Sequence, residues 1–323
     1  MSPATATAGG ATSESPPAGS LLALKGFTKS FGAVQALKDV DFSVEAGEVV
    51  GLVGDNGAGK STTMKMIAGI LTPDHGTIEV NGSLMTPQNI QLRKSLAYLP
   101  EQNPMYGELY VRESLEFMME LQGLGYRKEM IDEAIEACGL KQEQFKQIQN
   151  LSKGYKQRVG LAQSILHHPD LYILDEATTG LDPNQILDIR ALIKSLGKEH
   201  AVLISTHILQ EVESICHRCI VIHEGKIIAD DDMNMLKSKL SVKPSAVVTF
   251  DQSVELNKLQ HTWPGVVTSS TNSFLISDDD PLLTQNIFDW AVTHRYKIQE
   301  LKWVDNKIED VFHELTGKNR QSK

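Results

Sequence analysis

The 323-residue sequence has few cysteines, no long apolar run and no surplus of positive charge. Three cysteines are too few for a disulfide framework in a chain of this size, and they fit a protein of the reducing cytosol. No stretch approaches the roughly 20 apolar residues of a membrane-spanning helix. The start of the chain lacks the basic region and apolar run of a secretory signal. If the protein serves a membrane, we expect it to do so through a partner chain.

The charge balance is acidic, with a net charge of −10. A general nucleic-acid binder presents a basic face to phosphates, so we expect no nucleic acid as a partner. Attraction to anionic lipid by charge alone is disfavoured for the same reason. The apolar content of 41% and the charged content of 22% are those of an ordinary globular protein. The length has room for one large domain and a smaller one.

One glycine-rich stretch organises the chain: Gly54-Asp55-Asn56-Gly57-Ala58-Gly59-Lys60-Ser61-Thr62. The apolar run 48–53 before it predicts a buried parallel strand, and the spacing of 62–69 predicts a helix that ends at a glycine. In that context backbone N–H groups and a helix N-terminus can surround a phosphate. Lys60 can then reach the β- and γ-phosphates, and the Ser61 hydroxyl can bind Mg²⁺. A plain tight turn is the alternative interpretation.

Polar residues also follow two later apolar runs. The run 171–175 ends in Asp175 and is followed by Glu176, and Thr206 and His207 follow 201–205. In doubly wound sheets the carboxyl ends of the strands meet where ligands bind. One carboxylate can hold Mg²⁺ while the other polarises a water, as phosphate hydrolysis requires. A solvated strand end and a surface histidine are the alternatives.

The remaining patterns predict the organisation around this site. Residues 1–20 are a low-complexity tail that we expect to be disordered. Alternation at 22–27 and 40–44 predicts strands, and helical spacing over 110–166 predicts a mostly helical insertion. After a linker at 241–245, strand and helix patterns predict a small α+β domain whose last helix is 308–315.

Three local patterns allow two interpretations each. Ser152 suits a helix N-cap, but its hydroxyl, the Gly154 N–H and the helix N-terminus can also bind an anion. The set Cys216, His217, Cys219 and His223 resembles a zinc site, yet alternating strand faces would separate the side chains. Asp278–Asp280 suits a solvated turn better than a calcium site.

Taken in order, these motifs resemble the ATP-binding subunit of ATP-binding-cassette (ABC) transporters. Gly54–Thr62 resembles the Walker A loop, Leu171–Asp175 Walker B, Leu151–Tyr155 the signature, and Gly180–Asp182 the D-loop. The resemblance implies an α/β P-loop (RecA-like) core with an N-terminal antiparallel β subdomain. The resemblance covers about residues 21–232 and implies a nucleotide-binding domain at 21–238, with a helical insertion at about 103–168. The patterns after the linker predict a C-terminal accessory domain at 245–323.

The resemblance further implies Mg²⁺-dependent ATP hydrolysis with ATP and Mg²⁺ as cofactors. Glu176 is the implied general base, His207 the contact to the γ-phosphate and Lys60 the stabiliser of developing charge. The implied magnesium ligands are Ser61, Gln102 and Asp175. The implied ATP-binding residues are Phe31 (stacking on adenine), Gly54, Asp55, Asn56, Gly57, Ala58, Gly59, Lys60, Ser61, Thr62, Gln102, Ser152, Gly154 and Asp182.

The signature departs from the usual Leu-Ser-Gly-Gly-Gln and reads Leu-Ser-Lys-Gly-Tyr, with Ser152 and Gly154 retained. This form, the run Glu176–Pro183 and the ending Ile308–Phe312 resemble the ABC-2 exporter subfamily, including gliding-motility-type ATPases. The resemblance implies a homodimer that drives a separate integral-membrane permease from the cytoplasmic face of the cell membrane. A soluble ABC-type ATPase acting on a ribosome or an assembly complex is the alternative. The accessory domain could serve dimerisation, docking or ligand sensing.

Overall fold

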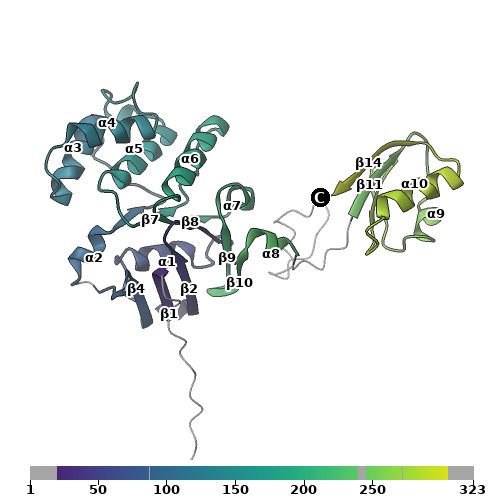
Figure 1. Cartoon of the computed structure of the whole chain (residues 1–323), viewed down its shortest axis with the longest axis horizontal. Coiled ribbons are helices and arrows are strands. Elements are labelled where there is room, and N and C mark those ends of the chain that lie inside the picture. Colours follow the sequence, from purple (N-terminus) through teal and green to yellow (C-terminus); the bar gives the residue numbers. More distant parts are fainter. Residues whose placement is uncertain (1–19, 87, 239–244, 271, 305–323) are drawn as a thin grey trace, which may run out of the picture. The chain divides into compact units, whose positions relative to one another are not determined.

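The computed structural model describes residues 20–86, 88–238, 245–270 and 272–304. The chain divides into two compact units after Met233, which we call the first and the second unit (Figure 1). The predicted tail (apart from Ser20), the predicted linker up to residue 244 and the predicted helix 308–315 lie outside the described residues. Within the described ranges, no helix combines the length and apolarity needed to cross a bilayer.

A six-stranded sheet in the order β10-β9-β3-β8-β7-β6 forms the centre of the first unit. Its strands are parallel except for β10, which pairs antiparallel with β9. Every residue of β3, β7 and β8 is buried, as expected for apolar strands covered on both faces. The parallel strands bring the polar residues that follow them to one edge. The bounds are β3 (Val49–Val53), β6 (Leu96–Leu99), β7 (Leu171–Asp175), β8 (Ala201–Thr206), β9 (Arg218–His223) and β10 (Lys226–Asp232).

A second sheet of the first unit is antiparallel, in the order β2-β1-β4-β5. The alternating pattern predicted strands here, and the family resemblance implied the antiparallel subdomain. Its strands are β1 (Ser20–Phe31), β2 (Val34–Glu45), β4 (His75–Val80) and β5 (Ser83–Leu84). It shares one core with helix α1 (Lys60–Ile67) and the central sheet. Phe27, Leu37, Leu52 and Met64 in that core are fully buried, so the two sheets hold α1 between them. The N-terminus of α1 thereby has a fixed position.

The predicted helical insertion contains α3 (Val111–Gln122), α4 (Lys128–Ala137), the short 3-10 helix η1 (Ile148–Asn150) and α5 (Lys153–Ile165). These helices form a group of their own beside α6 (Pro183–Leu196) (Figure 1). The buried Arg158 guanidinium links them, since it donates to the Cys138 carbonyl (3.0 Å) and to Asp188 Oδ2 on α6 (2.9 Å). The other helices are α2 (Ile90–Lys94), α7 (Leu209–Ile215) and α8 (Met233–Ser238).

The residues that resemble a zinc set lie directly after α7 and along β9. His217 Nδ1 accepts the Val49 N–H at 3.2 Å, and the Cys216 and Cys219 thiols are buried. Burial raises the pKa of both thiols, to about 12 for Cys219, so they pack as neutral groups. These side chains act as parts of the fold.

The described part of the second unit contains a four-stranded antiparallel sheet, in the order β12-β13-β11-β14, which packs with helices α9 and α10. Its core gathers Phe250, Trp263, Phe274 and Trp290, with the Trp263 and Trp290 rings 6.0 Å apart. This is the α+β arrangement that the strand and helix patterns predicted. The elements are β11 (Ser245–Phe250), α9 (Leu256–Gln260), β12 (Val267–Ser270), β13 (Ser273–Ser277), α10 (Leu283–Thr293) and β14 (Ile298–Val304).

Candidate active site

The glycine-rich loop joins β3 to α1 and folds as a phosphate-binding loop requires. Gly59 caps α1 with φ of +113°, and a Cβ there would come within 2.6 Å of Leu37 Cδ2. A Cβ at Gly54 would collide with the Ile222 carbonyl oxygen on β9. Neither position has room for a side chain. Close packing against neighbouring residues, and not the loop alone, therefore fixes the positions of the loop's N–H groups. Helix α1 begins directly after Gly59, so the positive end of its dipole lies at the loop.

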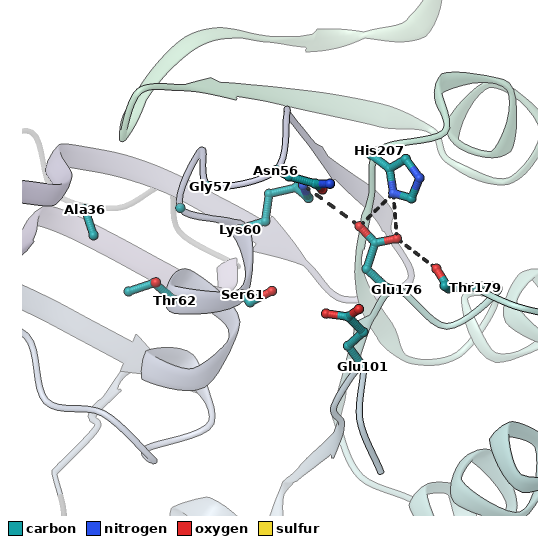
Figure 2. A pocket seen from close by; sticks show the side chains of 11 residues that line it. Ala36, Asn56, Gly57, Lys60, Ser61, Thr62, Glu101, Glu176, Thr179 and His207 are labelled. Carbon is teal, nitrogen blue, oxygen red and sulfur yellow. Dashed lines mark hydrogen bonds and ion pairs between the residues drawn. The ribbon is translucent and has the colours of Figure 1, made fainter. Parts of the chain in front are cut away.

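A pocket of about 440 Å³ lies over this loop. Figure 2 shows Lys60 and His207 both directed at Glu176, with Ser61 and Glu101 on the same side of the pocket. The lining residues are Ala36, Asn56, Gly57, Gly59, Lys60, Ser61, Thr62, Glu101, Glu176, Thr179 and His207. The pocket therefore combines the loop with the carboxyl ends of β6, β7 and β8, the edge at which the sequence placed the chemistry.

The Lys60 ammonium is buried at the centre of the loop. It donates to the Gly54 carbonyl at 2.7 Å and the Asp55 carbonyl at 3.1 Å, and it lies 3.9 Å from Glu176 Oε1. Burial lowers the pKa of Lys60, and the surrounding carboxylates, Glu176 foremost, oppose that shift. The lysine ammonium is thus held at the loop, where it can meet an anion bound in the pocket.

Glu176 follows β7 in an unusual backbone conformation, with φ of +53°. A non-glycine residue seldom adopts it, and such strain is concentrated at functional sites. Its buried carboxylate accepts the Thr179 hydroxyl at 3.0 Å, and His207 Nδ1 lies 2.9 Å from Oε2. Its N–H donates to the Ser205 hydroxyl at 3.2 Å. Two side chains therefore orient the carboxylate, and Ser205 holds the backbone of the same residue.

The neighbouring Asp175 is almost fully buried, with 1% of its surface exposed. Asp175 Oδ1 accepts two hydroxyl groups, Ser61 at 3.1 Å and Ser205 at 2.5 Å. Ser61 also lines the pocket, so one hydroxyl connects the phosphate loop to the buried carboxylate. This arrangement can hold an anionic phosphate and a hard cation together.

Comparisons with known proteins agree with this geometry. A family model described as ABC transporter matches residues 37–179. The bacitracin transport ATP-binding protein BcrA of Bacillus licheniformis is 31% identical over 300 residues, which cover 90% of this chain and 95% of that protein. The linearmycin resistance ATP-binding protein LnrL of Bacillus subtilis (strain 168) is 33% identical over 308 residues, which cover 92% of this chain and 99% of that protein. A solved ATP-binding subunit of an ABC transporter superposes with a TM-score of 0.62 at 32% identity, covering 68% of this chain and 92% of that one.

The chain belongs to the ABC transporter ATP-binding family. It is an ATP-binding and ATP-hydrolysing subunit of an ABC transporter, as the order of its motifs predicted. The fold is that of the family's cassettes, which confirms the predicted P-loop architecture. Subunits of this family pair with membrane permeases and dimerise.

Several predicted site residues of this ABC subunit lie outside the pocket lining. Ser152 caps α5 and accepts the Tyr155 N–H at 3.4 Å, while Gly154 packs against Gln185 of α6. Asp182 caps α6, accepts the Gln185 N–H at 2.9 Å, and is solvent-exposed. These three residues sit at helix starts, as their patterns predicted, and their contacts with nucleotide stay predictions.

Four further predicted residues, Phe31, Asp55, Ala58 and Gln102, are also absent from the pocket lining. Phe31, at the end of β1, is 49% exposed, and the Lys29 ammonium lies 5.7 Å from its ring centre. Gln102 is exposed in the loop after β6, and its neighbour Glu101 lines the pocket instead. Asp55 lies 3.9 Å from His223, and Ala58 is buried beneath the loop. The roles of Phe31 and Gln102 stay predictions.

Sequence reasoning missed three residues that the structure brings to the site. Ser205 joins the two acids, Thr179 holds Glu176, and Glu101 lines the pocket. A signal existed for Ser205, since it is a polar residue at the end of the apolar run before Thr206 and His207. A hydroxyl there has to bond with something buried.

Proposed function

We propose that this subunit cleaves ATP with Glu176 as general base, in a head-to-tail homodimer that drives a permease of the exporter type. The observation that carries the proposal is the convergence of Lys60, Ser61, Glu176 and His207 on one pocket above the phosphate-binding loop. Phosphoryl transfer needs positioning and charge stabilisation more than covalent chemistry, and these residues supply both.

Mg²⁺ fits the side chains at the loop. A serine hydroxyl and a carboxylate are the hard oxygen donors that this ion prefers, and Ser61 and Asp175 present them 3.1 Å apart. When bound, the ion would supply charge neutralisation to the phosphate oxygens. Gln102 is the third predicted ligand. Asp175 is buried, and its Oδ1 accepts the Ser205 hydroxyl, so the chain holds this carboxylate oxygen beside the loop.

Glu176 is the residue best placed to take a proton from water. Its carboxylate faces the pocket, and Thr179 and His207 fix its rotation. His207 contacts Glu176 through Nδ1, and its side chain is 47% exposed, which leaves the far side of the ring open to the pocket. His207 can therefore contact both the base and a terminal phosphate. Lys60 is placed to balance the negative charge that builds up on the phosphate.

A second copy of the chain would complete the site. Ser152 and Gly154 begin α5, where a hydroxyl and a helix N-terminus favour an anion. They do not line the pocket of their own chain. In a head-to-tail dimer each copy's α5 would meet the ATP held by the other copy, with Asp182 nearby at the start of α6. The negative charge of the shared ATP then holds the two copies together.

The relatives favour export. Proteins named for bacitracin transport and for linearmycin resistance match 90% and 92% of this chain, so the matches extend into the second unit. A transporter that gives resistance to a compound is expected to move it outwards. We infer an ABC-2-type exporter in which this subunit lies on the cytoplasmic face of the membrane and binds a separate permease. Co-purification with a polytopic membrane protein favours this proposal, whereas co-purification with ribosomes favours the alternative of a soluble ATPase.

Replacing the base tests the proposal. Glu176→Gln keeps the size and the Thr179 contact but removes the proton acceptor, so we expect hydrolysis to fall by about 10²–10⁴ while ATP binding persists. Light scattering with MgATP should then show a stable dimer, because the bound ATP is not consumed. Glu224→Gln is the matched control, a glutamate that also has positive φ (+47°) after a parallel strand but is not part of the pocket lining. Near-normal turnover in Glu176→Gln would remove Glu176 from this role.

A further inference from the structure

Tyr98 is a half-buried residue with a buried hydroxyl, and no role has been given to it so far. It lies on β6 and pairs in register with Ile173 of β7. Paired residues of parallel strands point to the same face, and so does every second residue along a strand. Tyr98 therefore shares a face with Ile173 and Asp175, the face that packs against α1, which carries Ser61.

The Tyr98 hydroxyl has an unusual environment. Its oxygen is buried and has no hydrogen-bond partner among the residues that the structure describes. Burial raises the pKa of the phenol, and the Asp175 carboxylate raises it further, by its charge and by a contact with the hydroxyl whose geometry falls short of a hydrogen bond. The group is therefore a neutral O–H donor at any physiological pH. A buried donor without an acceptor costs free energy, and the nearby acceptor is the Asp175 carboxylate.

Asp175 can accept another donor. Both hydroxyl groups bonded to it, those of Ser61 and Ser205, meet the same oxygen, Oδ1. Because both donors bond the same oxygen, the carboxylate can still rotate about the side-chain axis more freely than if each oxygen had a donor. A carboxylate that faces a cation needs that rotation fixed, and groups behind metal ligands commonly do this. Tyr98 is on the correct face for such a contact.

We propose that Tyr98 is a positioning residue for Asp175: when ATP and a divalent cation occupy the pocket, its hydroxyl donates to the carboxylate and fixes its orientation. This rests on the magnesium site proposed above. The proposal adds a contact from β6, the strand that leads into the loop of Glu101 and Gln102. Binding of ATP and the cation would therefore also restrain the end of this strand.

The chain contains a matched control residue. Tyr172 also has a buried hydroxyl without a hydrogen-bond partner in the described part of the chain, and it lies on the adjacent strand β7. It pairs with Ala97, so it points to the opposite face, where its ring meets His200 at 5.5 Å. Only burial raises the pKa of Tyr172, with no contribution from Asp175. Tyr98→Phe and Tyr172→Phe thus each remove one buried hydroxyl oxygen from adjacent strands, one beside Asp175 and one away from it.

The test is a Mg²⁺ titration of the full chain with a fluorescent ATP analogue, followed by the fluorescence of the bound nucleotide. We expect Tyr98→Phe to raise the half-saturating Mg²⁺ concentration about tenfold, with Tyr172→Phe unchanged. Binding of the analogue without Mg²⁺ should be equal in all three proteins. Excess Mg²⁺ should bring the turnover of Tyr98→Phe back towards the wild-type value.

Three outcomes would contradict the inference. If the wild type responds to Mg²⁺ and Tyr98→Phe responds equally, the role of Tyr98 is overturned but the proposed magnesium site is not. A wild-type protein that does not respond to Mg²⁺ overturns the proposed magnesium site and this inference together. A lower unfolding temperature of nucleotide-free Tyr98→Phe, with Tyr172→Phe unchanged, would show that the hydroxyl already has a partner before the site is loaded.

Discussion

At the scale of single residues, the two acids of the site are connected through Ser205. Its hydroxyl donates to Asp175 Oδ1 at 2.5 Å and accepts the Glu176 N–H at 3.2 Å. One small side chain on β8 thereby sets the position of a metal-binding candidate and of the candidate base on β7. The strained backbone of Glu176, with φ of +53°, depends on such support.

Removing this hydroxyl should impair turnover more than binding. We expect Ser205→Ala to lower the steady-state ATPase rate about tenfold, because both acids lose a fixing hydrogen bond while the phosphate-binding loop is untouched. Equilibrium binding of ATP should change little. Ser164→Ala is the control, since the buried Ser164 hydroxyl bonds only the Leu161 carbonyl of its own helix. Equal losses of turnover in the two variants would contradict the role given to Ser205.

The residues that sequence analysis found differ in kind from those it missed. Lys60, Ser61 and Glu176 belong to contiguous motifs whose spacing carries the chemistry, and the structure brings all three to the pocket. Ser205 and Thr179 act through contacts across strands and turns, where no spacing along the chain reveals the partner. Such partners become visible only once the register of β7 and β8 is known.

At the scale of elements, the connection between α5 and β7 carries a buried histidine. His167 Nε2 lies 3.0 Å from the Leu96 carbonyl on β6, which assigns its proton to Nε2. The other nitrogen, Nδ1, is buried without a partner in the described structure. Burial lowers the pKa of His167 below its ordinary value of 6.5, so the folded chain holds it neutral.

This burial predicts acid sensitivity of the fold. The pKa of His167 is lower in the folded chain than in the unfolded chain. The contribution of the neutral, buried imidazole to stability is therefore fully present above about pH 6.5, and it is lost as the pH falls from there towards the folded pKa. His167→Gln keeps a donor for Leu96 but does not titrate. We expect its free energy of unfolding to fall less between pH 7 and pH 5 than that of the wild type. Parallel pH profiles from urea unfolding, followed by far-UV circular dichroism, would contradict this expectation.

The predictability of the elements followed their length and periodicity. The apolar runs at β3, β7 and β8 and the helical spacing of α3 to α5 predicted the elements that support the site. The two-residue β5 and the five-residue α2 were missed, because such short segments contain less than two turns or two alternations of a pattern. Helix α1 begins at Lys60, two residues before the predicted start, because the loop delivers the lysine directly into the first turn.

At the scale of the whole molecule, each chain holds only part of the proposed site. All the lining residues of the pocket lie in the first unit, whereas Ser152 and Gly154 lie outside the lining. Their family likeness and their place at the start of α5 predict that they serve another copy's ATP. Only the resemblance to the family predicted this arrangement, because the packing of two copies leaves no pattern in the sequence of one chain. The identity of the permease is beyond one chain for the same reason.

Complementation between variants tests the shared site directly. Lys60→Ala disables the loop half, and Ser152→Asp disables the α5 half while keeping a good N-cap, since Asp caps helices as well as Ser but repels phosphate. A head-to-tail dimer of the two variants contains one site with both lesions and one intact site. A mixture of Lys60→Ala with Glu176→Gln is the control, because both lesions fall in the same half and leave no intact site.

The decisive measurement is the ATPase rate of the first mixture after the copies have exchanged at a one-to-one ratio. With random pairing, half of the dimers carry one intact site of two, so the account predicts recovery to about a quarter of the wild-type rate from two inactive proteins. The control mixture should stay inactive. A first mixture no more active than its separate components would mean that each chain cleaves ATP with its own residues alone, and would contradict the shared site.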